Sequence, residues 1–524
     1  MGIENCQLPT LILGVHPGRN IRALFAFPSL HFHKCRQRYV TAIYSVLFSC
    51  GLPVRVTFSL CDNMHFLRLI ALGLCACWTM GAADLLAAES KKPNILFIVG
   101  DDMGYADVGF HGCKDIPTPN LDAFAKSGVR FTSGYVSAPY CSPTRAGLLT
   151  GRYQEKFGHE FNPTTKETGL PLTETTIANR LKAAGYVTGI VGKWHLGSLP
   201  EMHPQKRGFD EFFGFLGGSH SYFKWDGMMR GTEPVKGTEY FTDAFGREAC
   251  EFIERHKGHP WFLYLAFNAV HTPMDATDDR LAKFKGTTDK KRQTYEAMMM
   301  ALDENVGRVL KKLGETGQEE NTLVTFISDN GGPIMPGTTI NGSRNDPLRG
   351  SKRTTLEGGI RVPFAISWKN HIKSGVYDLP VIQLDLTATA LGIAGVEATN
   401  LDGVNLLPFV SGEKKGAPHE ALYWRFGQQI AVRIGDYKLV RYDSNADTRT
   451  GKRDQPIAGP RLYNLAEDIG ESKDLYDSMP DKAKELQSKW DAWNATLMKP
   501  LWSFARSDFD GDPGEKKKKK KKQE

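Results

Sequence analysis

The chain has 524 residues, 41% of them hydrophobic, which is enough for one large α/β domain or two to three smaller domains. Its formal net charge of +7 matches seven consecutive lysines at 516–522, so the rest of the chain is electrically balanced. This distribution excludes a basic nucleic-acid-binding protein. It predicts a solvated, disordered lysine-rich tail over 507–524, with adhesion to an acidic surface as the alternative.

The beginning of the chain carries an export signal in an unusual place. A basic residue, a short apolar run and small residues follow one another over 64–89, a pattern typical of a secretory signal peptide and too short for a stable membrane span. We interpret 1–63 as a non-native or disordered extension ahead of a start at Met64. A genuine extension with the run as an anchor is the alternative. The protein is therefore expected to be exported, periplasmic or secreted, and Cys77 is a candidate for lipid attachment.

Apolar, β-branched runs alternate with amphipathic stretches from Pro93 onward. This alternation predicts an α/β fold with a large, mainly parallel central sheet between layers of helices. The predicted buried strands are 94–100, 186–192, 261–267 and 322–328. Helices are predicted over 173–184, with capping residues at its start, and over 290–313, with apolar residues at helical spacing.

The sequence changes in character near Gly416. Aromatic and apolar residues then alternate with polar ones, and a turn is predicted at Gly435 and Asp436. This pattern indicates an antiparallel hairpin or meander. We therefore predict a larger domain over 93–416 and a smaller α+β subdomain over 417–506.

Charged and polar side chains follow each of the four predicted strands. They are Asp101 and Asp102, then Lys193 and His195, then His271, then Asp329 and Asn330. Each motif alone is also compatible with a turn, a helix cap or a buried histidine. The carboxyl ends of parallel strands meet at one edge of a sheet, however, so these side chains are expected to share one pocket. Oxygen ligands suit Ca²⁺ or Mg²⁺, and adjacent cations suit a tetrahedral oxyanion.

Cys141 lies just before Pro143 and Arg145, in front of a short predicted helix that ends at Gly151. Proline favours the first turn of a helix, and a helix N-terminus stabilises a thiolate or an anionic ligand. These residues alone indicate a cysteine nucleophile that attacks a phosphate or sulfate ester. Hard cations prefer oxygen to sulfur, however, so a thiolate fits poorly beside the predicted metal site.

Six stretches together resemble the sulfatase family of the alkaline-phosphatase-like superfamily. They read PNILFIVGDDMGYADVGFHG, SAPYCSPTRAGLLTGRY, GIVGKWHLG, AFNAVHTP, FISDNGG and LRGSKRTTLEGGIRVP, and they fall within 93–363. The family signature Cys-x-Pro-x-Arg-x-x-x-Leu-x-Gly-Arg is complete at 141–152. The resemblance implies an alkaline-phosphatase-like fold, a catalytic domain over 93–416 and hydrolysis of a sulfuric ester.

The resemblance also implies a modified residue and a set of roles. A maturation enzyme would convert Cys141 to Cα-formylglycine, whose hydrate attacks the sulfate ester and later re-forms the aldehyde as sulfate leaves. The implied Ca²⁺ ligands are Asp101, Asp102, Cys141 in its modified form, Asp329 and Asn330. The implied catalytic residues are Arg145 (orients the diol), Lys193 and Lys352 (bind sulfate), His195 (assists breakdown of the diol) and His271 (protonates the leaving oxygen). Lys352 rests on the match alone, since Arg349 and Arg353 lie near it.

The substrate is predicted from the loops 151–163, 217–231 and 335–349. They carry side chains that suit a sulfated carbohydrate better than a small aryl sulfate: His159, His220, Tyr222, Phe223, Lys224, Trp225 and Arg344. The alternative reading of these loops is a variable surface with some buried aromatic side chains. Two other functions stay open, namely a phosphate mono- or diester hydrolase, although no second metal-ligand set is visible, and a sulfated-glycan-binding protein with unmodified Cys141. The sequence does not predict the oligomeric state.

Overall fold

The computed structural model describes residues 11–14, 22–25, 92–448 and 457–503. The predicted signal peptide, Cys77 and the lysine-rich tail lie outside the described residues. The chain divides into two compact units, Met1–Ser90 and Lys91–Glu524. In the first unit, β1 (Leu11–Gly14) pairs antiparallel with β2 (Arg22–Phe25). No helix within the described ranges has both the length and the apolar character needed to cross a membrane.

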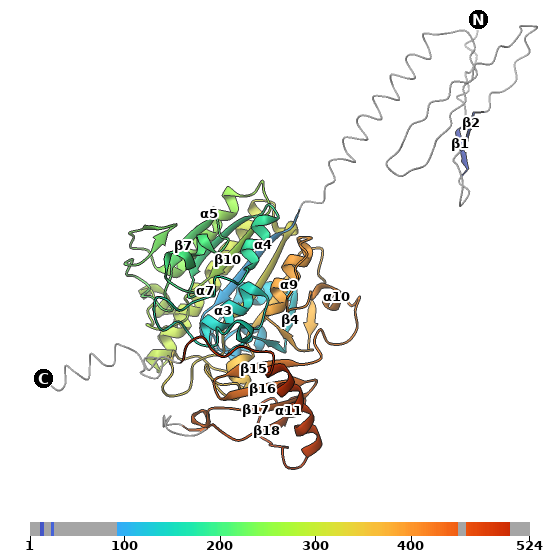
Figure 1. The fold of residues 1–524 in the computed structure, drawn as a ribbon. Coiled ribbons are helices and arrows are strands. Elements are labelled where there is room, and N and C mark those ends of the chain that lie inside the picture. The colour runs from blue at the N-terminus through green and yellow to red at the C-terminus, as the bar shows by residue number, and fades with distance from the viewer. Residues whose placement is uncertain (1–10, 15–21, 26–91, 449–456, 504–524) are drawn as a thin grey trace, which may run out of the picture. The chain divides into compact units, whose positions relative to one another are not determined.

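The second unit is built on a ten-stranded mixed sheet whose five central strands are parallel (Figure 1). In spatial order these are β11 (Thr322–Ser328), β3 (Asn94–Gly100), β10 (Trp261–Ala266), β6 (Val187–Lys193) and β7 (Glu211–Phe215). The sheet continues through β12 (Phe364–Ser367), β4 (Val129–Phe131) and β13 (Gly375–Tyr377) on one side, and through β8 (Met229–Arg230) and β9 (Glu233–Pro234) on the other. All four predicted strands are present, and they are adjacent to one another.

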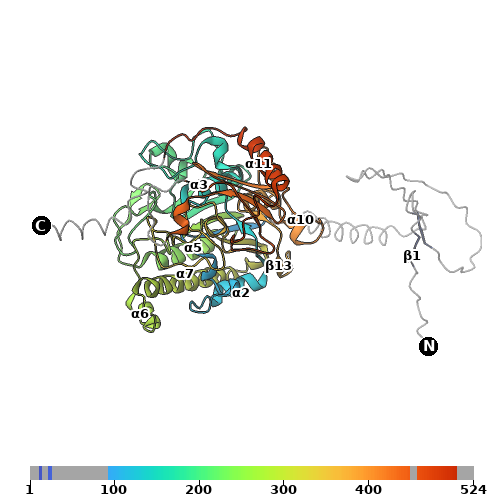
Figure 2. The same cartoon turned by 90° about the horizontal axis from the view of Figure 1, so that it is seen from below.

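Helices cover both faces of this sheet, as the alternating pattern predicted. Side chains of a strand point alternately to the two faces, so Leu96 and Ile98 of β3 belong to one core and Ile95 and Phe97 to the other. The first core contains α2 (Pro119–Ser127), α5 (Phe241–Arg255) and α7 (Lys290–Glu315); the second contains α3 (Cys141–Thr150), α4 (Ile177–Ala183) and α9 (Leu384–Ile393). Figure 2 shows α2 and α7 on the side of the unit opposite α3.

One predicted helix begins later than expected. The prediction placed its start at 173, but α4 begins at Ile177 because Thr176 forms the cap. The Thr176 hydroxyl accepts a hydrogen bond from the backbone N–H of Asn179, whose side-chain oxygen accepts one from the N–H of Thr176, each at 3.1 Å. This reciprocal cap satisfies the backbone N–H groups of Thr176 and Asn179. A helix that began at 173 would lose this cap.

The predicted antiparallel region forms a separate four-stranded sheet. It consists of β15 (Leu422–Phe426), β16 (Gln429–Ile434), β17 (Tyr437–Arg441) and β18 (Arg461–Asn464), with α11 (Pro480–Asn494) packed on one face. The remaining short elements are β5 (Gly134–Tyr135), which pairs with β14 (Val381–Ile382), and the helices α6 (Asp278–Leu281), α8 (Glu357–Ile360) and α10 (Leu407–Val410).

A buried ion network connects this second sheet to the segment at α8 that precedes β12 of the ten-stranded sheet. Lys438 of β17 pairs through Nζ with the carboxylates of Glu357 and Glu471, at 2.8 and 2.9 Å, and all three side chains are fully buried. Glu357 also accepts a hydrogen bond from the hydroxyl of Tyr135, at 2.6 Å. Because α8 begins at Glu357, the network fixes the segment that follows Lys352.

The raised pKa of the Glu471 carboxyl makes the free energy of unfolding depend on pH. Burial, and then the charge of Glu357, raise the pKa of Glu471 from 4.5 to about 7 even though Lys438 opposes the shift. The folded state therefore binds this proton more tightly, so the stabilisation is complete below pH 4.5 and is lost as the pH rises to 7. Denaturant unfolding across this range should show a decline of roughly 2–3 kcal/mol in wild type that Glu471→Gln lacks. The exposed Glu467→Gln variant should keep the decline, and an unchanged profile in Glu471→Gln would contradict the assignment.

Candidate active site

The structure brings the predicted side chains together at the carboxyl ends of the parallel strands. Asp101 and Asp102 directly follow β3, Lys193 ends β6, and Asp329 and Asn330 directly follow β11. His195 and His271 lie in the loops after β6 and β10, and no member of the set exceeds 9% exposure. These charged side chains are therefore shielded from solvent, and their stability depends on the ion pairs that they form with one another.

Cys141 is the first residue of α3, where the prediction placed it at or just before the helix N-terminus, and it points at two carboxylates. Its Sγ lies 3.6 Å from Oδ1 of Asp101 and 4.0 Å from Oδ1 of Asp102. Burial and the charge of Asp329 raise the pKa of the Cys141 thiol well above its ordinary value. Burial and the nearby carboxylates therefore oppose the thiolate that a helix N-terminus alone favours.

Arg145 lies one turn further along α3 and holds Asp329. Its Nε and Nη2 donate to the same oxygen, Oδ2, at 3.0 and 2.7 Å, and Nη2 lies 3.8 Å from Asp101. Burial raises the pKa of Asp329, but Arg145 and then Lys193 outweigh it and keep that pKa below the ordinary value. Asp329 is therefore an ionised carboxylate in a fixed orientation.

Two lysines pair with the two aspartates that follow β3. Lys193 Nζ lies 2.6 Å from Asp101 Oδ2, and Lys352 Nζ lies 2.7 and 2.8 Å from the two oxygens of Asp102. The structure also distinguishes Lys352 from the two arginines near it in the sequence. Arg349 pairs with Asp447 in the C-terminal subdomain, and Arg353 Nη1 donates to a backbone carbonyl, so neither takes the place of Lys352 against Asp102.

The two histidines approach the site from different loops and are both neutral. His271 Nδ1 lies 2.5 Å from the carbonyl of Thr272, which can only accept, so the ring proton is on Nδ1 and Nε2 faces Lys352 Nζ at 3.4 Å. Burial lowers the pKa of His271 to about 3. Burial and then Lys193 lower the pKa of His195 well below its ordinary value. Its Nδ1 has no hydrogen-bond partner in the described part of the chain.

The backbone is strained at two of these positions. Asp102 has φ +64° and His195 has φ +60°, which is the left-handed region that residues other than glycine rarely adopt. Such conformations cost roughly 1–3 kcal/mol and persist where the surrounding structure enforces them. Here the strain fixes the directions of one carboxylate and one imidazole in the pocket.

Oxygen donors in this cluster suit a hard divalent cation. The carboxylates of Asp101, Asp102 and Asp329 lie beside Asn330, whose Nδ2 donates to Asp102 at 2.8 Å. Asn330 Oδ1 is buried and has no hydrogen-bond partner among the described residues, so it is free to ligate. Ligand atoms of Asp101, Asp102, Cys141 and His271 all lie within 4.8 Å of one another. The donor chemistry therefore fits Ca²⁺, except for the sulfur of Cys141.

Sequence reasoning did not identify three side chains that support the site. Thr339 Oγ1 donates to Asp102 Oδ2 at 3.0 Å and accepts from Lys352 Nζ at 3.2 Å. Asn341 Nδ2 donates to the carbonyl of Asp102 at 3.0 Å, and the Tyr222 hydroxyl lies 2.9 Å from the carbonyl of His271. Tyr222 was predicted to contact substrate, and Thr339 and Asn341 lie in the predicted substrate loop 335–349, but no strand end or periodic pattern indicated that they hold Asp102 and His271 in place.

Several loop residues predicted to contact substrate are buried or already paired within the protein. His159 and Tyr222 are fully buried, and Trp225 donates through Nε1 to the carbonyl of Glu239. The two ring nitrogens of His220 pair with the backbone carbonyls of residues 221 and 226, and Arg344 pairs with Asp115 at 2.9 Å. Phe223 and Lys224 are exposed. These positions follow the alternative reading of the loops more closely than the substrate-contact prediction.

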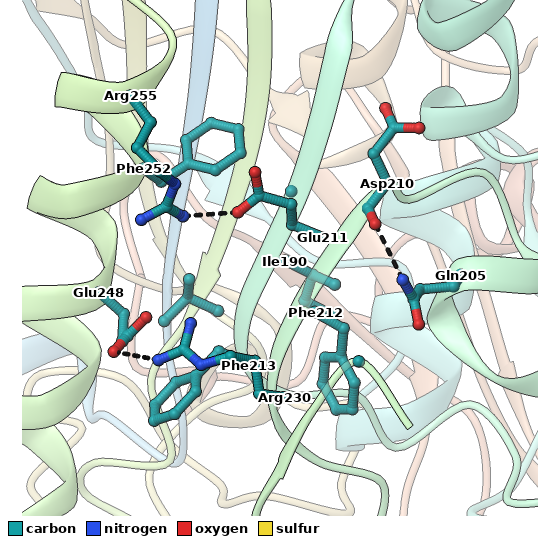
Figure 3. A pocket seen from close by; sticks show the side chains of 13 residues that line it. Ile190, Gln205, Asp210, Glu211, Phe212, Phe213, Arg230, Glu248, Phe252 and Arg255 are labelled. Carbon is teal, nitrogen blue, oxygen red and sulfur yellow. Dashed lines mark hydrogen bonds and ion pairs between the residues drawn. The ribbon is translucent and has the colours of Figure 1, made fainter. Parts of the chain in front are cut away.

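A separate hollow of about 410 Å³ lies between α5 and the strands β6 and β7 (Figure 3). Its charged groups already pair with one another: Arg255 lies 2.5 Å from Glu211, and Arg230 lies 2.6 Å from Glu248. None of the predicted catalytic residues lines it. The strand-end cluster is therefore the candidate active site.

Comparisons with known proteins give consistent relatives for the chain. The sequence model of the sulfatase family matches residues 93–396, and that of the N-sulphoglucosamine sulphohydrolase C-terminal region matches 350–492. N-acetylgalactosamine-6-sulfatase of Mus musculus is 36% identical over 68% of this chain and 74% of its own. Arylsulfatase A of Bos taurus is 35% identical over 78% and 89%. The solved structure of Ps i-CgsB in complex with k-i-k-neocarrahexaose is 37% identical, with a TM-score of 0.73 over 80% of this chain and 96% of that one.

Proposed function

The chain belongs to the sulfatase family and is a sulfuric ester hydrolase, and we propose that it removes sulfate from a carbohydrate by means of Ca²⁺ and a formylglycine made from Cys141. The observation that carries the proposal is the position of residue 141. Its side chain faces Asp101 and Asp102 at the N-terminus of a helix, one turn from Arg145. A sulfur there is a poor ligand for a hard cation and a poorly ionised nucleophile, whereas an oxygen serves both purposes.

Asp101, Asp102, Asp329 and Asn330 would hold the cation together with an oxygen of the modified residue 141. When bound, Ca²⁺ neutralises charge on the sulfate oxygens. The hydrated aldehyde supplies the attacking hydroxyl and, by re-forming the carbonyl, a way to expel sulfate without a new attack by water. A formylglycine-generating enzyme or an equivalent is the partner that this chemistry requires.

The remaining side chains bind and position the ester. Lys193 and Lys352 present ammonium groups to the sulfate oxygens, and Arg145 orients residue 141. His271 is the group nearest to Lys352 that can protonate the leaving oxygen, through Nε2. Burial and the two lysines disfavour the protonated form of this imidazole, and the negative charge of a bound sulfate ester would favour it. His195 assists release of sulfate from residue 141.

A carbohydrate is the substrate class that we propose. The names of the relatives include an N-acetylgalactosamine-6-sulfatase, and Ps i-CgsB was solved with a neocarrahexaose. In this chain, Phe223 and Ile334 expose 36% and 44% of their surfaces, and Lys224 lies beside the first of them. Such apolar and cationic groups suit the face of a sugar ring and its anionic substituents. Export to the periplasm or the medium, where such glycans occur, is part of the same proposal.

Paired substrates test the function directly. The mature full-length enzyme is assayed on 4-nitrophenyl sulfate, on 4-nitrophenyl phosphate and on sulfated hexosamine and galactan oligosaccharides, with Cys141→Ala beside it. We expect sulfate release that the variant lacks, and a formylglycine mass for the tryptic peptide containing residue 141. Faster phosphate turnover would favour a phosphatase. Glycan binding without turnover, with an unmodified thiol, would favour a binding protein.

Metal removal gives a second measurement. Ca²⁺ that binds only the folded protein stabilises it by about 2.7 kcal/mol at a hundredfold excess over its dissociation constant. We expect chelation to abolish activity and lower the melting temperature, and Ca²⁺ to restore both. Asn330→Leu should weaken the response of the melting temperature to Ca²⁺, while the exposed Asp477→Asn should not alter it. A wild-type melting temperature that does not change with Ca²⁺ would exclude the proposed calcium site.

A further inference from the structure

A chain of two hydrogen bonds connects His159, through the hydroxyl of Ser142, to the backbone carbonyl of His195. The Ser142 hydroxyl lies 2.6 Å from the carbonyl oxygen of His195 and 2.7 Å from Nε2 of His159. A carbonyl can only accept, so the single hydroxyl proton of Ser142 goes to His195, and His159 must donate from Nε2. Ser142 and His159 are both fully buried. The order of donation is therefore fixed from His159 through Ser142 to His195.

His195 needs such support because its own backbone is unfavourable. The residue holds φ +60°, and its N–H donates to the carbonyl of Leu216 at 3.1 Å. The carbonyl of the same residue accepts a hydrogen bond from the hydroxyl of Ser142, which lies in the first turn of α3. Backbone direction at His195 determines where its imidazole points. One hydroxyl thus sets the relation between the nucleophile position and this imidazole.

A second layer holds His159 and Ser142 in place. The side-chain oxygen of Asn162 accepts a hydrogen bond from the N–H of Ser142 at 3.1 Å, so the same loop binds the start of α3 twice. Trp502 packs edge-on against His159, with ring centroids 4.8 Å apart, and its Nε1 donates to the carbonyl of Asn162 at 2.8 Å. The last described segment of the chain therefore packs against the loop that carries His159.

We propose that Ser142 and His159 are positioning residues for His195, with Trp502 as their outer support. The inference rests on the proposed function, in which His195 assists the release of sulfate from residue 141. A defect in positioning should therefore slow that second step and leave formation of the enzyme–substrate complex unchanged. The expected signature is a lower kcat with a constant or lower KM, and a rapid first release of alcohol followed by a slow steady rate.

His159 is the better position to alter, because Ser142 lies inside the signature at 141–152 and its replacement could affect maturation of Cys141. His159→Leu removes the donor, and His159→Gln keeps an N–H that can reach Ser142. The full-length enzyme is used, and rates are divided by the fraction of formylglycine in the peptide containing residue 141. We expect kcat on 4-nitrophenyl sulfate to fall about 30-fold in His159→Leu, with a burst of nitrophenol, and to recover to within about fivefold of wild type in His159→Gln.

Other outcomes decide against the inference. Wild-type kcat in His159→Leu, or a raised KM with unchanged kcat, would overturn it. Equal losses in both His159 variants would also overturn it, because packing and not donation would then matter. If His159→Leu does not fold, Ser142→Ala against Ser142→Thr makes the same comparison, and rescue by the threonine hydroxyl is expected. If wild-type enzyme with residue 141 fully converted to formylglycine had no activity, the proposed function would be wrong, and the inference that rests on it would fail as well.

Discussion

A Cys141→Ser variant is expected to release one equivalent of alcohol per active site and then to stop. The serine hydroxyl supplies an oxygen where the sulfur of Cys141 stands, between Asp101 and Asp102. It can attack the sulfur of the ester while the bond to the leaving oxygen breaks, so that the serine loses one proton and the alcohol gains one from His271. The serine sulfate that results has no second hydroxyl with which to expel the sulfate. Steady-state kcat should fall by roughly a thousandfold or more.

Rapid mixing with 4-nitrophenyl sulfate measures the burst, and intact mass measures the retained sulfate. The host must convert cysteine but not serine, which the peptide mass verifies. Cys141→Ala is the matched control, and it should give neither a burst nor an added mass. Continuous turnover by Cys141→Ser at the wild-type rate would show that residue 141 does not carry the sulfate.

Replacing Lys438 by methionine is expected to produce the largest loss of stability. The ammonium group lies between the carboxylates of Glu357 and Glu471, and all three are fully buried. Removing one partner of a buried ion pair costs about 3–5 kcal/mol because an uncompensated charge stays behind. The pKa of Glu357, which Lys438 and then Arg361 keep at about 2 against the effect of burial, would rise. Part of the cost should then appear as proton uptake on folding.

Denaturant unfolding with the full chain measures this loss. Lys489→Met is the matched control, since Lys489 pairs with Glu420 on the surface, with both side chains largely exposed. Surface pairs contribute about 0–1 kcal/mol, so this variant should stay near wild type. Equal effects of the two substitutions would show that the buried network does not stabilise the fold. A parallel decrease in kcat is expected for Lys438→Met, because α8 follows the segment that carries Lys352.

The strand-end residues could be predicted because their pattern is local. A buried strand reads as a short apolar run, and the residue that follows it lies at the edge of the sheet, so Asp101 and Asp329 are placed by sequence alone. Lys352 has no such signal. It lies in an irregular basic loop, and only the resemblance to a family separated it from Arg349 and Arg353. The structure explains the choice, because Lys352 is the one that reaches Asp102.

Predictions that depended on competing energies were less successful. A helix N-terminus favours the thiolate of Cys141, but burial and the nearby carboxylates reverse the effect. His159 looked like a surface cation, yet the loop folds inward and burial lowers its pKa to about 3. The sequence analysis had already judged a thiolate a poor fit beside the metal site, and the two differences have the same origin. Sequence shows the charge that a side chain can carry, but the three-dimensional neighbours decide whether it carries it.

The buried ion network also limits how this enzyme can be recombined with its relatives. The two family matches overlap between residues 350 and 396, and that overlap contains Lys352 and Glu357. A chimera joined near 416 would take Glu357 from one parent and Lys438 and Glu471 from the other. A crossover placed ahead of Gly350 keeps Lys352, Glu357 and the partners of Glu357 in one inherited segment. For laboratory shuffling, the natural unit of exchange therefore begins inside the catalytic fold and ahead of the second sheet.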